Sequence, residues 1–405
     1  MILRSNSLQI PLRDKSVHCV VTSPPYWSLR DYAVNGQLGL EKTPEEYVEK
    51  MAMVFREVWR VMKPEATLWL NMGDSYNAAG RNGHGTRIGC KQMTNRASAC
   101  GDDHNRSTSP GLKPKDLCGI PWRLAFALQA DGWYLRSDII WAKPNPMPES
   151  VTDRPTKSHE YVFLLSKQPS YFFDQEAVRE KSITGDPRRP YTSEGAWQMD
   201  GRPKEQRHGG EVRIGCRKEL RSGIESRHRC AIDGGQSMQA EPNGGRNIRT
   251  VWNIATQPFP ESHFATFPEE LARRCILAGT SEKGVCPKCG GPWVRVLETQ
   301  KAISKTCPKE QASHEARGGT GEHTGTVGKS GSGRIDGYTK TLGWKPSCKC
   351  GLDPVPAVVL DPFAGSGTVG IVCAKYRRNF IGLDPKAEYC QMAKKRIYEQ
   401  PPTMI

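Results

Sequence analysis

Two short turns carry residue types that could act together on an aromatic amine. The first, Thr22-Ser23-Pro24-Pro25-Tyr26-Trp27, follows an apolar run at 16–21, and its double proline ends any strand or helix there. The Ser23 hydroxyl and the Pro24 carbonyl could accept the two N–H hydrogens of an exocyclic amine and favour a pyramidal, nucleophilic nitrogen. Tyr26, with Trp27 behind it, could stack on a base taken out of its helix. The alternative is a rigid turn with an incidental aromatic residue.

The second turn, residues 361–368 (Asp-Pro-Phe-Ala-Gly-Ser-Gly-Thr), lies between a predicted strand at 355–360 and a predicted helix at 368–376. Gly365 and Gly367 would let the backbone approach a ligand closely, and the helix start offers free N–H groups. The next predicted strand, 379–384, ends in Asp384, an acid suited to ribose hydroxyls. These features predict a nucleoside site, with a dinucleotide site as the alternative.

With the two motifs in this order, the chain resembles the site-specific DNA amino-methyltransferases of permuted β-type, in which the catalytic motif precedes the cofactor motif. The resemblance covers most of residues 1–171 and 250–398. It implies an α/β, Rossmann-like, S-adenosylmethionine-dependent methyltransferase fold with a circularly permuted motif order. By this resemblance the catalytic residues are Ser23, Pro24, Pro25 and Tyr26, and the cofactor residues include Asp361, Phe363, Gly365, Gly367, Thr368 and Asp384.

Three other segments share the resemblance. Residues 263–271 resemble the family segment that encloses the methionine end of the cofactor, which implies cofactor roles for His263, Thr266 and Phe267. Residues 141–150 and 158–161 resemble the segment that shapes the target-base pocket. Asn6 stands where relatives often carry an aspartate near the cofactor adenine.

The resemblance implies double-stranded DNA as the substrate and S-adenosyl-L-methionine as the cofactor. Serine at the first tetrapeptide position favours the N4 amine of a flipped cytosine, with adenine N6 as the alternative. Because an amine attacks the sulfonium methyl directly, we expect no covalent intermediate. Two other classes are a non-catalytic DNA-binding protein and a methyltransferase that acts on RNA or a protein amide. A cognate restriction endonuclease is a candidate partner, and the sequence predicts no oligomeric state.

The net charge of +15 is concentrated in three polar segments. Residues 81–115, 201–230 and 301–350 each carry five more basic than acidic residues, and the rest of the chain is balanced. A basic excess beside a neutral α/β core indicates contact with a polyanion such as DNA. Solubility or an unstructured basic loop is the alternative reading of each segment.

The elements that must position the two turns are predicted from periodicity. A capping box at 43–46 opens a helix over 43–63, followed by a strand at 66–72, a helix at 121–130 and strands near 134–142 and 160–166. Residues 355–398 hold only two strands and two helices, too few for a core of their own. We therefore expect them to complete a sheet begun near the amino terminus, with both chain ends in one domain.

Composition suggests a division of the chain. Residues 1–171 form the catalytic half of the methyltransferase domain, with a mobile loop at 78–114, and 172–250, rich in Gly, Arg, Ser and Gln, form the target-recognition insertion. Residues 251–280 and 351–400 form the cofactor half. Residues 281–350 form a small cysteine-rich insertion with a flexible part at 301–340.

Cysteine spacing predicts a metal in that insertion. Cys286-Pro-Lys-Cys289 and Cys348-Lys-Cys350 could supply four thiolates to a structural Zn²⁺, with Cys307 in reserve; unrelated free thiols are the alternative. The chain has 14 cysteines, no apolar run long enough to span a membrane and no signal-peptide pattern near residue 1. These observations predict a cytoplasmic protein with reduced thiols and no membrane partner.

Overall fold

The structure is a computed structural model that describes residues 1–29, 36–77, 111–181, 245–257, 267–300, 303–304, 334–335 and 338–399. Its helices are α1 (Pro44–Val61), α2 (Ile120–Ala130), α3 (Glu269–Gly279), α4 (Thr368–Lys375) and α5 (Ala387–Tyr398), with a 3-10 turn at Glu176–Val178. The main sheet contains β1 (Ile2–Arg4), β2 (Val17–Thr22), β3 (Met62–Met72), β4 (Tyr134–Ala142), β5 (His159–Ser166), β8 (Val251–Asn253), β13 (Val358–Asp361) and β14 (Asn379–Asp384).

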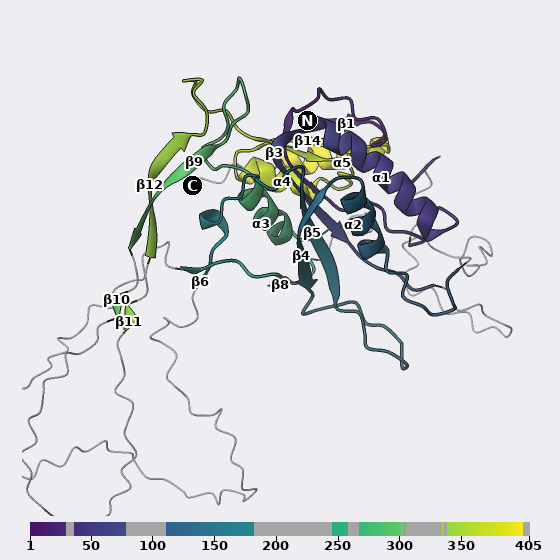
Figure 1. Ribbon diagram of the computed structural model, residues 1–405. Helices are drawn as coiled ribbons and strands as arrows, with labels where there is room; N and C mark the ends of the chain where they lie inside the picture. Colours follow the sequence, from purple (N-terminus) through teal and green to yellow (C-terminus); the bar gives the residue numbers. More distant parts are fainter. Residues whose placement is uncertain are drawn as a thin grey trace, which may run out of the picture. The chain divides into compact units, whose positions relative to one another are not determined.

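The main sheet has the strand order β1-β14-β13-β2-β3-β5-β4-β8. Neighbouring strands from β1 to β3 are parallel, and β5 runs antiparallel to both β3 and β4. The first and the last strand of the main sheet in sequence order lie side by side, since β1 pairs with β14 and Arg4 lies opposite Asp384 (Figure 1). The predicted permuted α/β sheet is therefore confirmed.

Helices cover both faces of this sheet. In β2 the side chain of Val20 belongs to the apolar cluster shared with α1 and α2, whereas Cys19 and Val21 belong to the cluster shared with α3, α4 and α5. This alternation follows from the two-residue repeat of a strand. Because both faces of the strand are buried there, Cys19, Val20 and Val21 are all apolar, and the polar residues of β2 are His18 and Thr22.

Helix α1 begins as its capping box predicts and ends earlier than expected. The Thr43 hydroxyl accepts a hydrogen bond from Glu46 N at 3.2 Å, and Pro44 occupies the first turn. The helix ends at Val61 instead of residue 63, because Lys63 precedes Pro64 and that position disfavours helical backbone. β3 therefore begins at Met62.

The strand expected at 355–360 is also shorter than predicted. β13 covers only Val358–Asp361, and Val355 instead forms an isolated bridge with Val285. Within the apolar run at 355–360, Val355 therefore pairs with the cysteine-rich insertion, and the residues from Val358 onward enter the main sheet.

The remaining strands belong to three small sheets: β6 (Glu180–Lys181) with β7 (Gly245–Arg246), β9 (Trp293–Gln300) with β12 (Tyr338–Pro346), and β10 (Ile303–Ser304) with β11 (Arg334–Ile335). Two compact units are distinguished, one of residues 1–180, 247–300 and 339–405 and one of 181–246 and 301–338. In the described part of the chain no helix combines the length and apolarity needed to cross a membrane. Most of the predicted loop at 78–114, recognition insertion and flexible 301–340 segment lies outside the described residues.

Candidate active site

The two predicted turns meet at the point where the sheet reverses its winding. From β13 the chain continues through α4 to β14 on one side, and from β2 it continues through α1 to β3 on the other. Neighbouring parallel strands whose connections leave in opposite directions form a crevice at their carboxyl ends, where α/β proteins bind ligands. Here the Thr22 hydroxyl donates a 2.7 Å hydrogen bond to Asp361 Oδ1. The turn after β2 and the turn after β13 therefore share one site.

The glycine turn after β13 is held by the acid of the neighbouring strand. Gly365 and Gly367 have φ values of +48° and +79°, which other residues adopt at a cost. Gly365 N donates to Asp384 Oδ2 at 3.1 Å, and Phe363 N donates to Asp361 Oδ1 at 3.0 Å. Phe363 and Gly365 stay partly exposed between buried neighbours. The turn thus offers an apolar ring and bare backbone to a ligand.

Burial raises the pKa of the two carboxyl groups that hold this turn, Asp361 at the end of β13 and Asp384 at the end of β14. Asp361 is 2% exposed, and this burial raises its pKa from 3.8 to about 7 against the opposing hydrogen bonds from Thr22 and Phe363. Burial likewise raises the pKa of Asp384, whose Oδ1 also accepts from Lys386 N at 2.8 Å. A carboxyl group that titrates near neutrality can become charged when a cation binds beside it.

On the other side of the site, one amide joins the proline turn to β5. Tyr26 Oη donates to Glu160 Oε2 at 2.7 Å. Asn71 Nδ2 shares its two hydrogens among three acceptors, Tyr26 Oη at 2.9 Å, Glu160 Oε2 at 3.0 Å and Ser23 Oγ at 3.3 Å. Ser23 Oγ in turn donates a long 3.3 Å bond to Tyr26 Oη. Because the Ser23 bonds are long, its hydroxyl can reorient toward a ligand at little cost.

The Tyr26 ring is fixed by close packing. A Cβ added at Gly73 would lie 2.5 Å from Tyr26 Cε2, so the ring occupies the space that any other residue at position 73 would fill. Tyr47 Oη donates to the Pro25 carbonyl at 2.8 Å, which anchors the turn to α1. No donor in the described part of the chain reaches the Pro24 carbonyl, which leaves it available as an acceptor. Burial, followed by the Glu160 carboxylate, raises the pKa of Tyr26 well above 10, so Tyr26 acts as a neutral donor.

Lys143 balances the charge of Glu160. The two side chains form an ion pair between Lys143 Nζ and Glu160 Oε1, and both are largely buried. Lys143 also lies 4.4 Å from the centre of the Trp141 ring. Residues from the two segments that resemble a target-base pocket are thus brought together beside Tyr26.

Of the other predicted cofactor residues, some lie near the glycine turn and some lie outside the described residues. Ser7, next to Asn6, donates to the Pro362 carbonyl at 2.5 Å, so the Asn6 turn borders the glycine turn, although Asn6 Oδ1 itself accepts from Leu8 N. Thr368 is buried at the start of α4, and Phe267 is half-buried before α3. His263 and Thr266 lie outside the described residues.

Sequence reasoning missed Thr22 and Asn71 as members of the site. Each is a buried polar residue near the carboxyl end of a strand whose neighbouring residues there are apolar, Val20 and Val21 in β2 and Leu70 and Met72 in β3. That position is the signal that could have found them, since such strand ends line the crevice of an α/β sheet.

The four cysteines form a separate cluster. The sulfur atoms of Cys286, Cys289, Cys348 and Cys350 all lie within 4.8 Å of one another. The other described cysteines, Cys19, Cys118, Cys275, Cys373 and Cys390, are buried.

Comparison with known proteins identifies relatives of this chain. The family model described as DNA methylase, of N6 and N4 methyltransferases, matches residues 17–286 and 354–395. The Type II methyltransferase M.Cfr9I of Citrobacter freundii is 36% identical over 96% of this chain and 84% of its own length, and M.SmaI of Serratia marcescens is 36% identical over 94% and 83%. Among solved structures, PvuII DNA methyltransferase (cytosine-N4-specific) is 13% identical, covering 98% of this chain and 85% of its own, with a TM-score of 0.48.

The length and identity of the matches to the family and to the two Type II enzymes identify the chain. It belongs to the DNA methylase family and is a DNA amino-methyltransferase.

Proposed function

We propose that this protein transfers a methyl group from S-adenosyl-L-methionine to the exocyclic N4 amine of a cytosine flipped out of duplex DNA. The observation that carries the proposal is the Thr22–Asp361 hydrogen bond, which joins a turn suited to an amine to a turn suited to a nucleoside at one crevice. Serine at position 23 favours cytosine, as the family resemblance implies.

The glycine turn fits the proposed cofactor. Gly365 is partly exposed and carries no side chain, so its backbone is open to a ligand, whereas a Cβ at Gly367 would lie 2.8 Å from Ala393 Cβ, so that glycine lets α5 pack closely against the turn. We assign the ribose to the Asp384 carboxylate, whose unused lone pairs can accept from hydroxyls, and an apolar contact to Phe363. The Asp361 carboxyl would attract the positive charge of the ligand. When bound there, S-adenosylmethionine supplies an electrophilic methyl group.

The residues of the proline turn would hold the acceptor amine. Ser23 Oγ and the Pro24 carbonyl accept its two N–H hydrogens, which directs the nitrogen lone pair out of the base plane. The Tyr26 ring stacks on the extruded base, and its hydroxyl is held by Glu160 and Asn71. The nitrogen would attack the methyl carbon while the methyl–sulfur bond breaks to release S-adenosylhomocysteine, and the proton then lost from the methylated nitrogen would pass to solvent. We assign no proton transfer to Ser23, Pro24 or Tyr26.

A covalent intermediate on the enzyme is not part of this proposal. An exocyclic amine can attack the methyl group directly, and the described cysteines outside the cluster are buried in the core. Transfer should therefore survive replacement of any one of these cysteines that leaves the protein folded.

The test identifies the modified nucleoside. Purified protein is incubated with mixed-sequence duplex DNA and methyl-labelled cofactor, and the DNA is digested to nucleosides for mass spectrometry. We expect N4-methylcytosine; label only in N6-methyladenine would refute the cytosine assignment and leave the family intact. DNA treated with a Ser23→Ala variant serves as the control, and this variant should lose turnover while its cofactor affinity stays within about twofold.

The second candidate is methylation of adenine N6, because adenine presents the same exocyclic amine to the same two acceptors. Both assignments predict DNA as the substrate, and the same digestion separates them. The relatives M.Cfr9I and M.SmaI are named Type II methyltransferases. We therefore also propose a cognate restriction endonuclease, whose cleavage the methylated DNA should resist.

A further inference from the structure

The cysteine cluster closes the base of the insertion between α3 and β13. Cys286 and Cys289 precede β9, and Cys348 and Cys350 follow β12, so the two pairs come from the two ends of the same excursion. β9 and β12 pair with each other beyond the cluster, as the two-stranded ribbon of Figure 1 shows. All four sulfur atoms lie within 4.8 Å of one another.

The backbone of the first pair is shaped around its sulfur atoms. Gly290 N donates to the Cys286 carbonyl and Cys286 N to the Gly291 carbonyl, both at 2.8 Å. Gly290 adopts a φ of +80°, which turns the following N–H inward, and Gly291 N then points to Cys289 Sγ at 3.4 Å. A metal-bound thiolate keeps negative charge, and an N–H directed at the sulfur stabilises it.

We propose that Cys286, Cys289, Cys348 and Cys350 bind one Zn²⁺ ion. In tetrahedral coordination with Zn–S distances of about 2.3 Å, the sulfur atoms would be separated by about 3.8 Å, within the observed spread. Four sulfur ligands without oxygen donors select Zn²⁺ over hard cations such as Mg²⁺. Because all four positions are taken by protein, the ion has no open site for a substrate.

The position of the cluster also indicates a structural role. Lys63 Nζ, near the start of β3, donates to the Cys289 carbonyl at 3.1 Å, and Val285 N and Val355 N exchange hydrogen bonds with each other's carbonyls at 2.8 and 2.9 Å. These contacts lie at the amino ends of β3 and β13, whereas Ser23 and Asp361 lie at or beyond the carboxyl ends of β2 and β13. The ion would therefore hold the insertion to the amino ends of the strands, whereas the active site lies at their carboxyl ends.

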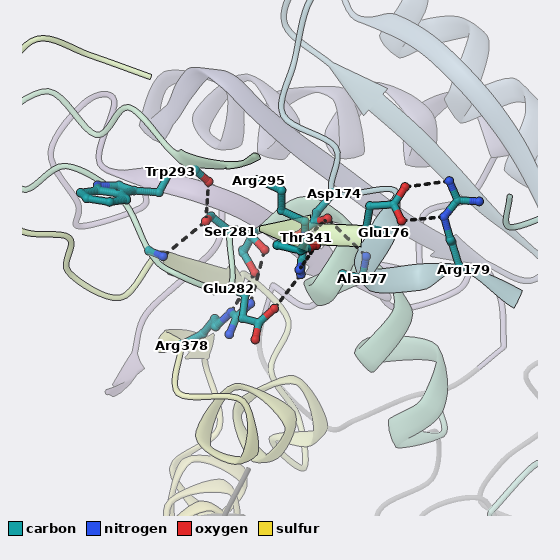
Figure 2. Close-up of polar contacts among 12 residues, drawn as sticks. Asp174, Glu176, Ala177, Arg179, Ser281, Glu282, Trp293, Arg295, Thr341 and Arg378 are labelled. Carbon is teal, nitrogen blue, oxygen red and sulfur yellow. Dashed lines mark hydrogen bonds and ion pairs between the residues drawn. The ribbon is translucent and has the colours of Figure 1, made fainter. Parts of the chain in front are cut away.

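Arg295 forms a second contact between the β9–β12 ribbon and the rest of the domain. Arg295 of β9 donates to both oxygens of Asp174 at 2.9 and 3.0 Å and to Glu282 Oε2 at 2.6 Å (Figure 2). Its guanidinium also lies 4.4 Å from the Trp344 ring of β12. The ribbon is thus tied to the core by an ion pair on β9, and the Zn²⁺ ion would tie its two ends together.

The experiment measures metal in the full-length protein, purified with reductant and without added zinc. We expect about one zinc per chain by elemental mass spectrometry, and Co²⁺ substitution should produce thiolate charge-transfer bands and tetrahedral d–d absorption. Cys289→Ser and Cys348→Ser should each lose most of the zinc. Cys307→Ser, in the same insertion, and Cys390→Ala, in α5, are matched controls that should retain it.

Several results would overturn the inference: absence of zinc from the folded wild-type protein, retention of zinc in both Cys289→Ser and Cys348→Ser, or loss of zinc in Cys307→Ser. If the serine variants do not fold, a mercurial titration of the wild type replaces them: the release of one zinc should coincide with the reaction of about four thiols, counted separately from thiols that react without zinc release. Cofactor affinity of zinc-depleted, folded protein should stay within about twofold of the loaded protein. These readouts are independent of methyl transfer, so failure of the proposed function would leave them unchanged.

Discussion

From the hydrogen bond between Thr22 and Asp361 we predict how cofactor affinity changes when the Thr22 hydroxyl is removed. Both side chains are almost completely buried, at 1% and 2% exposure, and the hydroxyl stabilises the charged form of the acid. Thr22→Val keeps the shape of the side chain and removes this donor. A hydrogen bond to a charged group contributes about 1.5–3 kcal/mol, which corresponds to roughly one to two pKa units.

The pKa of Asp361 should therefore rise from about 7 to roughly 8–9 in the valine variant. At pH 7 the ionised fraction would fall from about one half to between about 1 and 10%. If the cationic cofactor binds the ionised form, its affinity at pH 7 should fall about 5- to 50-fold. Near pH 9.5 the acid is mostly ionised in both proteins, and their affinities should agree within about twofold.

The assay is calorimetric titration of S-adenosylmethionine between pH 6 and 9.5 into wild type, Thr22→Val and Thr22→Ser. The ratio of two affinities at one pH cancels any titration of the ligand itself. Thr22→Ser keeps the hydroxyl and should follow the wild-type profile, while circular dichroism establishes that each protein is folded. The reasoning is refuted if the ratio for Thr22→Val is independent of pH, or if the serine variant shows the same loss.

Three other perturbations test the site. Gly73→Ala places a Cβ 2.5 Å from Tyr26 Cε2, so single-turnover methylation should slow by about tenfold or more at unchanged cofactor affinity; an unchanged rate would show that the ring position is unimportant. Tyr26→Phe keeps the ring and loses the bond to Glu160, so quenched-flow rates should fall less than in Tyr26→Ala, and equal losses would contradict stacking. Between about pH 4 and pH 7 the folded state keeps a proton on Asp361 that the unfolded state has released, because burial raises the pKa of this acid. The free energy of unfolding of the cofactor-free protein should therefore decrease as the pH rises through this range. Urea titrations of Asp361→Asn should lack this slope, and parallel curves for the two proteins would be evidence against the buried acid.

The local elements of the sheet and helices followed from short-range chemistry. The Thr43–Glu46 capping box, the apolar strand runs and the glycine turn before α4 each depend on neighbours within a few residues, so they could be predicted directly. It could also be inferred that the carboxyl-terminal segment completes a sheet begun near the amino terminus, because that segment is too small to bury its own apolar faces. The pairing of β1 with β14 came from the structure.

The contents of the site were predicted incompletely for a physical reason. Nothing near Asn71 in the chain shows that its amide will meet Ser23, Tyr26 and Glu160, because these contacts join residues 45 to 89 positions apart. The same holds for the pKa of Asp361, which depends on how completely the folded sheet excludes water from its carboxyl group.

The amino-acid sequence by itself determined which residue types stand at the ends of which strands, and through them the fold class and the two motifs, since these depend on local backbone preference and periodicity. Only the tertiary structure decided which strand ends are neighbours. By placing β13 beside β2, it set Thr22 against Asp361 and formed one crevice from turns more than 330 residues apart. The physical reason is that burial and long-range hydrogen bonding are properties of the packed sheet, which no single segment carries alone.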